Sequence, residues 1–258
     1  DTLPSRGLGD VYKRQVELDP GCTYLLLNRK KGIAQDPAWA EFLSNALNAA
    51  DLFVHIPKET VIDLGVLHAY GIKPGWYDIK LNTPVCPPAN AKSIIRLAYQ
   101  CQHPMFPTLA KAIVTVLKQY NIDVELIGYE TDPPHADNVD IWINPMGIAN
   151  NRDDALAGWL MDYSFLDESS PAEDFDQWCH MIDRWRSGEF DQFPARQLGK
   201  QLVQSNQLIP MFHCWLGVNK DQCGTLQNAK CNALGWFDFS QVWVCLLYTS
   251  PSPRDGNV

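Results

Sequence analysis

The feature that most constrains the fold of this 258-residue chain is a strand–helix–strand pattern in its middle. Residues Ile94–Tyr99 form a short apolar run that suits a buried strand. The apolar residues that follow recur at helical spacing, at Leu109, Ile113, Val116, Leu117 and Tyr120. The segments IDVEL (122–126) and VDIWIN (139–144) then have the alternation and length of strands. A strand, a crossover helix and a strand in this order predict an α/β fold with parallel strands and a right-handed connection.

The flanking segments predict further elements of the same kind. TYLLLN (23–28) is a continuous apolar run typical of a buried strand, and Asp36-Pro37 predicts the start of a helix. Apolar residues at helical spacing over 175–185 predict a second amphipathic helix, and LIPMFHCWLGV (208–218) returns to strand character. Strands therefore lie on both sides of the central pattern in the sequence.

The two ends of the chain differ in character from the rest. SRGLGDVYKRQ (5–15) and CLLYTSPSPRD (245–255) can be encoded by the two complementary strands of one DNA word, read one base out of phase. That word resembles the transposase adaptor used to prepare sequencing libraries. We therefore interpret residues 1–15 and 245–258 as translated adaptor, which leaves Val16–Val244 as an informative segment that is open at both ends.

The composition of residues 16–244 excludes some classes of function. The segment has 17 basic and 27 acidic side chains, a formal net charge of −10. Because proteins bind the phosphates of nucleic acids through Lys and Arg, this segment is a poor candidate for DNA contact. No apolar run approaches the roughly 20 residues of a membrane span. Seven cysteines without CxxC pairs favour a reducing compartment over a disulfide framework, and their spacing predicts no metal site.

The order of the predicted elements resembles the C-terminal half of the family-5 extracellular solute-binding proteins, the oligopeptide- and dipeptide-type binding subunits of ABC importers. This likeness is carried by TYLLLN, the Asp-Pro helix, SIIRLAYQ, IDVELIGYE and LIPMFHCWL. A narrower likeness, to cytoplasmic sugar-phosphate-stress transcriptional regulators, is carried by YGIKPGWYD, HCWLGV and NALGWFDFSQVW. In those regulators a winged helix-turn-helix domain precedes such a solute-binding domain. The resemblance covers nearly all of residues 20–244.

The resemblance implies an α/β fold of the two-lobed, periplasmic-binding-protein-like kind (type II), truncated here to its C-terminal half. It implies that residues 16–88 and 206–244 belong to lobe I and that residues 89–205 form most of the second lobe. The hinge would lie near residues 84–92 and 205–210. The two lobes would close on a small solute, either a sugar phosphate or a short peptide.

Two departures from the importer pattern favour the regulator branch. Only nine residues, ETDPPHADN, lie between Tyr129 and Val139, where importers insert a helix. The segment GWLMDYSF (158–165) also lacks the Asp-Pro continuation found where importers bind the amino terminus of a peptide. A peptide ligand is therefore less favoured.

Five side chains are candidate ligand-binding residues: Asn28, Trp76, Asn144, Arg152 and Trp159. Asn144 ends a predicted strand, where ligands of open α/β sheets bind. Trp76 and Trp159 could stack on a sugar or grip a peptide side chain, or could simply be packed. Arg152 could hold a phosphate or carboxylate bidentately, or form an exposed ion pair. Asn28 could instead hydrogen-bond the backbone between the lobes.

The sequence leaves two functions open. The preferred one is a ligand-sensing fragment of a cytoplasmic bacterial transcriptional regulator, which contacts DNA only through an N-terminal domain outside this segment. The alternative is the periplasmic substrate-binding subunit of a peptide or solute ABC importer. Both need a small-molecule solute and the missing N-terminal half of the same chain, and neither needs membrane insertion. An enzyme is not expected, because GxSxG, HExxH, P-loop and GxGxxG motifs are absent, and no cofactor or metal is expected either.

Overall fold

The computed structural model describes residues 15–18, 21–60, 66–77, 86–88, 94–147, 152–162, 164–218, 226–227, 230–231, 237–238 and 243–244. It forms two compact units, one made of Leu18–Trp215 and one made of Asp1–Glu17 with Leu216–Val258. Apart from Gln15, the segments that we interpret as translated adaptor lie outside the described residues.

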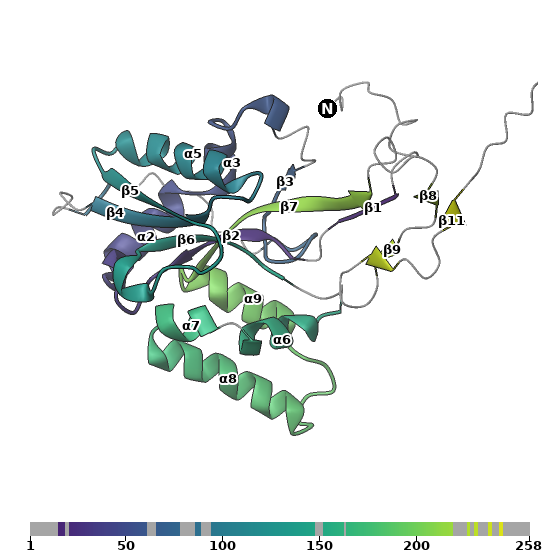
Figure 1. The fold of residues 1–258 in the computed structure, drawn as a ribbon. Coiled ribbons are helices and arrows are strands. Elements are labelled where there is room, and N and C mark those ends of the chain that lie inside the picture. The colour runs from purple at the N-terminus through teal and green to yellow at the C-terminus, as the bar shows by residue number, and fades with distance from the viewer. Residues whose placement is uncertain are drawn as a thin grey trace, which may run out of the picture. The chain divides into compact units, whose positions relative to one another are not determined.

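The larger unit is built around a mixed sheet with the strand order β7-β2-β6-β4-β5 (Figure 1). The bounds of its strands are Thr23–Leu27 for β2, Ile94–Gln100 for β4, Asp123–Tyr129 for β5, Ile141–Pro145 for β6 and Leu208–Val218 for β7. A short strand, β3 (Val66–His68), pairs with β7. Strand β4 runs parallel to β5 and to β6, which confirms the predicted strand–helix–strand unit. Strand β2 is antiparallel to both β6 and β7, so the sheet as a whole is mixed rather than parallel.

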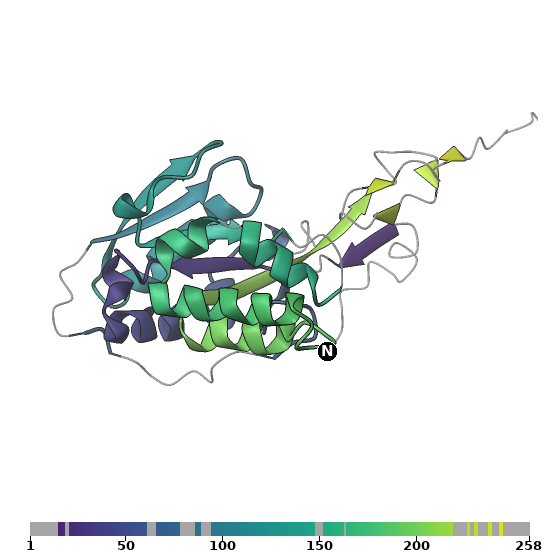
Figure 2. The same cartoon turned by 90° about the horizontal axis from the view of Figure 1, so that it is seen from below.

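Helices cover both faces of this sheet. On one face lie α2 (Pro37–Ala46), α3 (Ala49–Phe53) and α5 (Phe106–Lys118). On the other lie α6 (Ala155–Asp162), α7 (Ser164–Ser169), α8 (Ala172–Arg186) and α9 (Ala195–Gln204), the green helices of Figure 2. Two 3₁₀ turns, η1 (Ile33–Gln35) and η2 (Ala136–Asn138), complete the unit. None of the helices described is long and apolar enough to cross a membrane.

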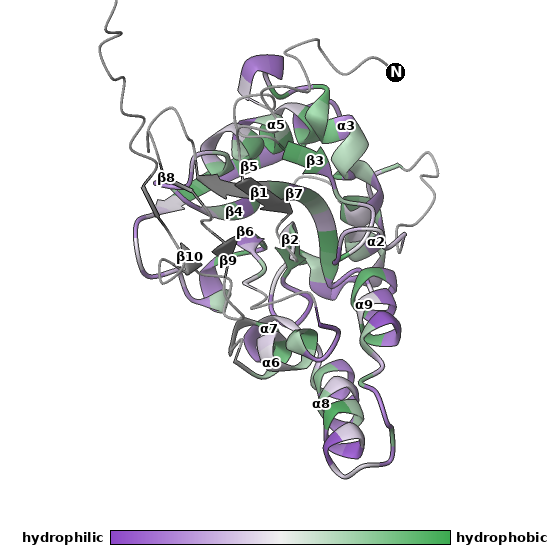
Figure 3. Cartoon of the chain, turned by 90° about the vertical axis from the view of Figure 1, so that its right-hand side faces the viewer, coloured by the Kyte–Doolittle hydropathy of each residue, from purple (hydrophilic) through white to green (hydrophobic). Residues whose placement is uncertain are grey.

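Two hydrophobic cores result, one on each face. Strand β2 contributes to both because its side chains alternate: Leu25 and Leu27 pack in the core under α2, α3 and α5, and Tyr24 and Leu26 pack in the core under α6–α9. Figure 3 shows apolar residues, in green, along α3, α5 and β3. All five residues of β2 are buried, since the strand has a neighbour on each side and helices on each face.

Local signals explain where the predicted helices begin. Asp36 lies at the N-cap of α2, and its Oδ1 accepts a hydrogen bond from the Ala38 N–H at 2.9 Å. Pro37 then occupies the first helical position, where its missing N–H costs nothing. The apolar residues Trp39, Phe42 and Leu43 turn inward and are buried, as their spacing predicts.

The smaller unit contains NALGWFDFSQVW (232–243), one of the three segments that carry the narrower family likeness. Its described elements are β1 (Gln15–Leu18), β8 (Leu226–Gln227), β9 (Lys230–Cys231), β10 (Phe237–Asp238) and β11 (Trp243–Val244). Strand β10 pairs antiparallel with β9, and β11 pairs antiparallel with β8.

Strands from both predicted lobes pair in one sheet. Strand β2, assigned to lobe I, pairs along its whole length with β6, assigned to the second lobe, so that Tyr24 lies opposite Asn144. Residues 205–210, proposed as one hinge, lie inside the compact unit Leu18–Trp215. The lobe boundaries at 88/89 and 205/206 stay a prediction. The two compact units meet along the chain at residues 17/18 and 215/216.

The start of α5 predicts a pH-dependent stability. The His103 ring stacks on Phe106 with 3.5 Å between ring centroids, and its Nδ1 accepts a hydrogen bond from the Met105 N–H at 3.2 Å. Burial lowers the pKa of His103 from 6.5 to about 4. Because the folded state favours the neutral ring, this stabilisation is complete above pH 6.5 and is lost as the pH falls from 6.5 towards about 4.

We therefore expect the melting temperature of the native protein to fall more steeply between pH 7.5 and 4.5 than that of His103→Asn, measured by circular dichroism. Asparagine keeps an acceptor but does not titrate, so the difference between the two curves isolates the imidazole. Parallel curves would contradict the assignment.

Candidate functional site

The carboxyl ends of β4, β5 and β6 meet at one edge of the sheet because the three strands are parallel. Asn144 lies there, as predicted, and is only 5% exposed. Its Oδ1 accepts a hydrogen bond from the Tyr129 hydroxyl at 3.3 Å, and burial raises the pKa of Tyr129, which keeps this hydroxyl protonated to high pH. Its buried Nδ2 has no hydrogen-bond partner in the described part of the chain. Among the described residues, the carboxyl ends of these strands therefore carry the Tyr129–Asn144 hydrogen bond and one amide donor, Asn144 Nδ2, without an acceptor.

Asn28 has the contacts of a structural residue. It is fully buried, and its Nδ2 donates hydrogen bonds to the carbonyl oxygens of Ala136 at 2.7 Å and Val139 at 2.8 Å. Its Oδ1 accepts from the Lys31 N–H at 2.9 Å. These bonds join the end of β2 to the turn before β6, within one compact unit, so the backbone-binding alternative describes Asn28 better than ligand contact does.

Trp76 anchors the loop of residues 69–77 to α9. A Cβ placed on Gly199 would lie 2.7 Å from Cζ3 of the Trp76 ring, so only glycine leaves room for the indole there. The cationic groups of Lys73 and Arg196 lie 5.8 and 5.5 Å from the ring centroid, within cation–π range. Lys73 also donates to Asp153 at 3.0 Å, which ties the same loop to the start of α6. Trp76 is therefore held by packing.

Trp159 lies in the core under α6–α9. It is 6% exposed, and its ring meets the Tyr24 ring edge-to-face with 5.8 Å between centroids and 87° between planes. The Trp159 ring is thus packed in this core, and a ligand contact for it stays a prediction.

Arg152 and Asp154 form an exposed ion pair immediately before α6. The guanidinium donates from Nε and Nη2 to the two carboxylate oxygens of Asp154, at 3.0 and 2.5 Å. The Arg152 side chain is 76% exposed. Asp154 thus occupies the bidentate face of the guanidinium, the face that could otherwise hold a phosphate or carboxylate.

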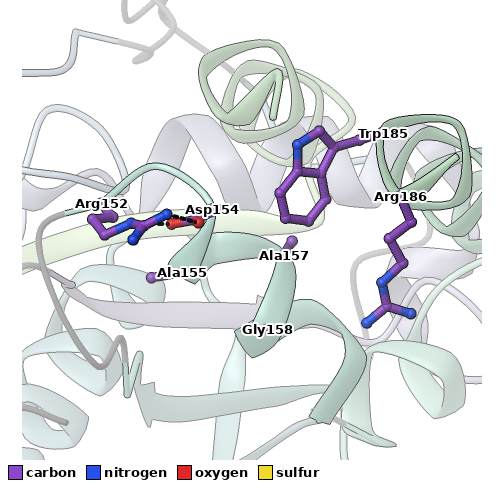
Figure 4. A pocket seen from close by; sticks show the side chains of 7 residues that line it. All are labelled: Arg152, Asp154, Ala155, Ala157, Gly158, Trp185 and Arg186. Atoms are coloured by element: carbon purple, nitrogen blue, oxygen red, sulfur yellow. Dashed lines mark hydrogen bonds and ion pairs between the residues drawn. The ribbon is translucent and has the colours of Figure 1, made fainter. Parts of the chain in front are cut away.

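A shallow pocket of about 450 Å³ lies beside this ion pair, between α6 and the end of α8 (Figure 4). It is lined by Arg152, Asp154, Ala155, Ala157, Gly158, Trp185 and Arg186. Figure 4 shows the Trp185 ring over Ala157, with Arg152 on one side and Arg186 on the other. A Cβ placed on Gly158 would meet nothing within 4 Å, so the small residues of α6 keep this space open.

The chemistry of the pocket suits a ring that carries an anion. Arg186 is exposed and makes no ion pair with any described residue, so its guanidinium can bind carboxylate or phosphate oxygens. The half-buried Trp185 packs its edge on Phe193, with 5.1 Å between centroids, which fixes the indole beside the two guanidinium groups. An indole face stacks on sugars and other rings.

Sequence reasoning missed Trp185 and Arg186. The helical spacing predicts Trp185 on the apolar face of its helix, and that spacing does not single out Arg186. The available signal was the triplet Arg184-Trp185-Arg186, in which an indole lies between two guanidinium groups in the last turn of a helix.

The described residues show neither a cluster of metal-ligating side chains nor a disulfide. No group of three or more His, Cys, Asp or Glu residues in the described segments could hold a metal ion. The five cysteines described, Cys22, Cys86, Cys101, Cys179 and Cys214, form no disulfide with one another.

Sequence comparison finds transcriptional regulators. No protein-family model matches the chain. The HTH-type transcriptional regulator SgrR of Escherichia coli O157:H7 is 26% identical over 248 residues, which is 95% of this chain and 42% of that protein. SgrR of Salmonella typhi is 25% identical over 238 residues, which is 92% of this chain and 40% of that protein. The chain thus spans about two fifths of the length of these curated relatives.

Structure comparison finds peptide- and solute-binding proteins. A dipeptide binding protein from Pseudoalteromonas sp. SM9913, in complex with Met-Leu, matches 93% of this chain and 52% of its own at a TM-score of 0.61 and 10% identity. NikA from Brucella suis, in complex with Fe(III)-EDTA, matches 92% of this chain and 54% of its own at 0.60 and 14%. At these identities the likeness shows the fold alone, and it confirms the predicted half of a periplasmic-binding-protein-like fold. The chain is therefore a homologue of SgrR-type transcriptional regulators, and its own fold is that of about half a periplasmic solute-binding protein.

Proposed function

We propose that this chain is the ligand-sensing, solute-binding part of a cytoplasmic bacterial transcriptional regulator. One observation supports this most: regulator homology extends over 95% of a chain that has a solute-binding fold. The rest of the protein would complete the two lobes and supply a DNA-binding domain. Closure of the lobes on a solute would bias that domain between two states. To shift the equilibrium between the open and closed forms tenfold, the solute must bind the closed form more strongly by ~1.4 kcal/mol.

The solute in this proposal is a sugar phosphate or a short peptide. Both carry an oxyanion, and the pocket between α6 and α8 offers the guanidinium of Arg186 and, beside it, the Arg152–Asp154 ion pair. The Trp185 ring lies between them and could stack on a sugar ring or a peptide side chain. The homologues and structural neighbours are regulators and binding proteins, and the proposal includes no catalytic step, cofactor or metal.

The alternative is the periplasmic substrate-binding subunit of an ABC importer, which would have the same fold. It is favoured by the structural neighbours alone, among them the Escherichia coli murein tripeptide binding protein MppA (TM-score 0.58, 13% identity). Reading the source DNA upstream of residue 16 separates the two functions. We expect a winged helix-turn-helix coding region. An export leader would overturn the regulator and establish the importer subunit.

Replacing Arg186 tests the pocket in the full-length protein. We expect Arg186→Ala to weaken the binding of a hexose phosphate or a tripeptide about tenfold or more, because a charge-assisted hydrogen bond contributes ~1.5–3 kcal/mol. Isothermal titration calorimetry measures the change.

Arg184→Ala is the matched control for this experiment. Arg184 lies in the same turn of α8 but pairs with Glu189 and does not line the pocket. Equal effects of the two substitutions, or unchanged affinity in Arg186→Ala, would count against this pocket as the solute site.

A further inference from the structure

Strand β5 forms an open edge of the central sheet. All seven of its residues pair in parallel with β4, from Asp123 opposite Ile94 to Tyr129 opposite Gln100. In the described part of the chain no strand pairs with its other side, and β5 lies outermost in Figure 1. Backbone N–H and C=O groups along such an edge point outward without a ladder partner and can accept another strand.

The side chains of β5 give this edge little protection. Proteins usually block an open edge with charged side chains, lysine above all, or with proline or a bulge. The sequence DVELIGY has two acids, Asp123 and Glu125, but no lysine or proline, and its pairing with β4 shows no shift of register. The connection from β5 to β6 contains only the short turn η2, so no helix from that connection covers the edge. Leu126, at the middle of β5, is 39% exposed, whereas its partner Leu97 on β4 is fully buried.

The sequence of β5 is complementary to itself in one antiparallel register. If two copies pair about a twofold axis through Leu126, all seven residues are used. Glu125 then faces Ile127, Asp123 faces Tyr129, and Leu126 meets its own symmetry mate. No like charges lie directly opposite each other, which would be destabilising. A register centred on Glu125 would place that carboxylate opposite itself, so charge disfavours the neighbouring alternative.

We propose that β5 pairs antiparallel with β5 of a second copy of this chain, about a twofold axis at Leu126, which joins the two sheets into one. The contact is isologous, the commonest kind in symmetric dimers. Because each copy carries a formal net charge of −9, the contact should tighten as ionic strength rises. A twofold contact also suits helix-turn-helix proteins, whose dimers read two half-sites.

Light scattering coupled to gel filtration tests this contact on the whole chain at roughly 10–100 µM, a range that spans the affinity of weak interfaces. We expect a dimer for the native sequence and a monomer for Leu126→Lys, which brings two ammonium groups together on the axis. Leu67→Lys is the matched control, since Leu67 is an exposed leucine on the short strand β3 (43% exposed), and it should leave the dimer intact.

A second measurement uses oxidation. Opposite residues of an antiparallel pair have Cα atoms about 4.5–5.5 Å apart, which a disulfide can span. Leu126→Cys should therefore form a reducible covalent dimer, whereas Leu67→Cys, with the same native cysteines, should not. A native chain that is monomeric throughout the concentration range overturns the proposal. A dimer that survives Leu126→Lys, or cross-links equally in both cysteine variants, places the contact elsewhere and overturns it too.

Discussion

Replacing Asp140 with alanine is expected to destabilise the larger unit by about 3 kcal/mol, the low end of the range for breaking a buried ion pair. The Asp140 carboxylate is almost fully buried and accepts four hydrogen bonds. The donors are the Ile33 N–H at 2.9 Å, the Arg96 N–H at 2.9 Å, and Arg96 Nε and Nη2 at 3.0 and 3.2 Å. Alanine would leave these donors without an acceptor. The low end applies because the Arg96 side chain is 32% exposed and can regain water.

Urea unfolding followed by circular dichroism measures this loss as a lower midpoint at unchanged slope. Asp137→Ala is the matched control, since Asp137 pairs with Lys31 at 2.7 Å on the surface, where both side chains are about half exposed or more. We expect little change for it, because exposed ion pairs are screened by water. Equal midpoints for the two variants would contradict the role given to Asp140.

Asn28→Ala is expected to cost about 3 kcal/mol, because each buried polar group left without a partner costs ~1–3 kcal/mol. The carbonyl oxygens of Ala136 and Val139 would each lose a donor, and the Lys31 N–H would lose its acceptor. Asn48→Ala is the matched control, because Asn48 caps the exposed start of α3 and accepts from the Asp51 N–H at 3.0 Å. Removing such a cap costs ~1 kcal/mol.

The same variant separates structure from binding. If Asn28 only supports the fold, solute affinity per folded molecule should match that of the native protein when it is measured by calorimetry well below the unfolding transition. A lower affinity in a fully folded sample would return Asn28 to the set of ligand-binding residues. Chemical denaturation of Asn28→Ala and Asn48→Ala in parallel gives the stability comparison.

Several elements could be predicted because their signals lie within one short window. The spacing of Leu109, Ile113 and Val116 shows a helix face without reference to any neighbour, and α5 has that face buried. The Asp36-Pro37 pair marks the start of α2 in the same way. Even the parallel pairing of β4 with β5 follows from local order, because one helix separates the two strands and such connections are right-handed.

The residues of the candidate pocket could not be predicted from any one short stretch of sequence. Periodicity identifies the apolar side of α8, but it does not show which helix the end of α8 meets. Trp185 and Arg186 become pocket residues only because α6 lies beside them with Ala157 and Gly158. Trp76 and Trp159, which composition favoured as cleft aromatics, are held by Gly199 and Tyr24, residues more than 100 positions away in sequence.

The amino-acid sequence alone was enough for the α/β class, for the likeness to solute-binding proteins and for most of the sheet with its longest helices. The elements predicted in this way are β2, α2, β4, α5, β5, β6, α8 and β7. The sequence alone did not predict how the chain divides into compact units. That division depends on β2 pairing with both β6 and β7, contacts such as Tyr24 with Asn144 that join residues 120 positions apart. Local propensity carries no information about such pairs, since their stability comes from backbone hydrogen bonds and packing that exist only once the chain has folded.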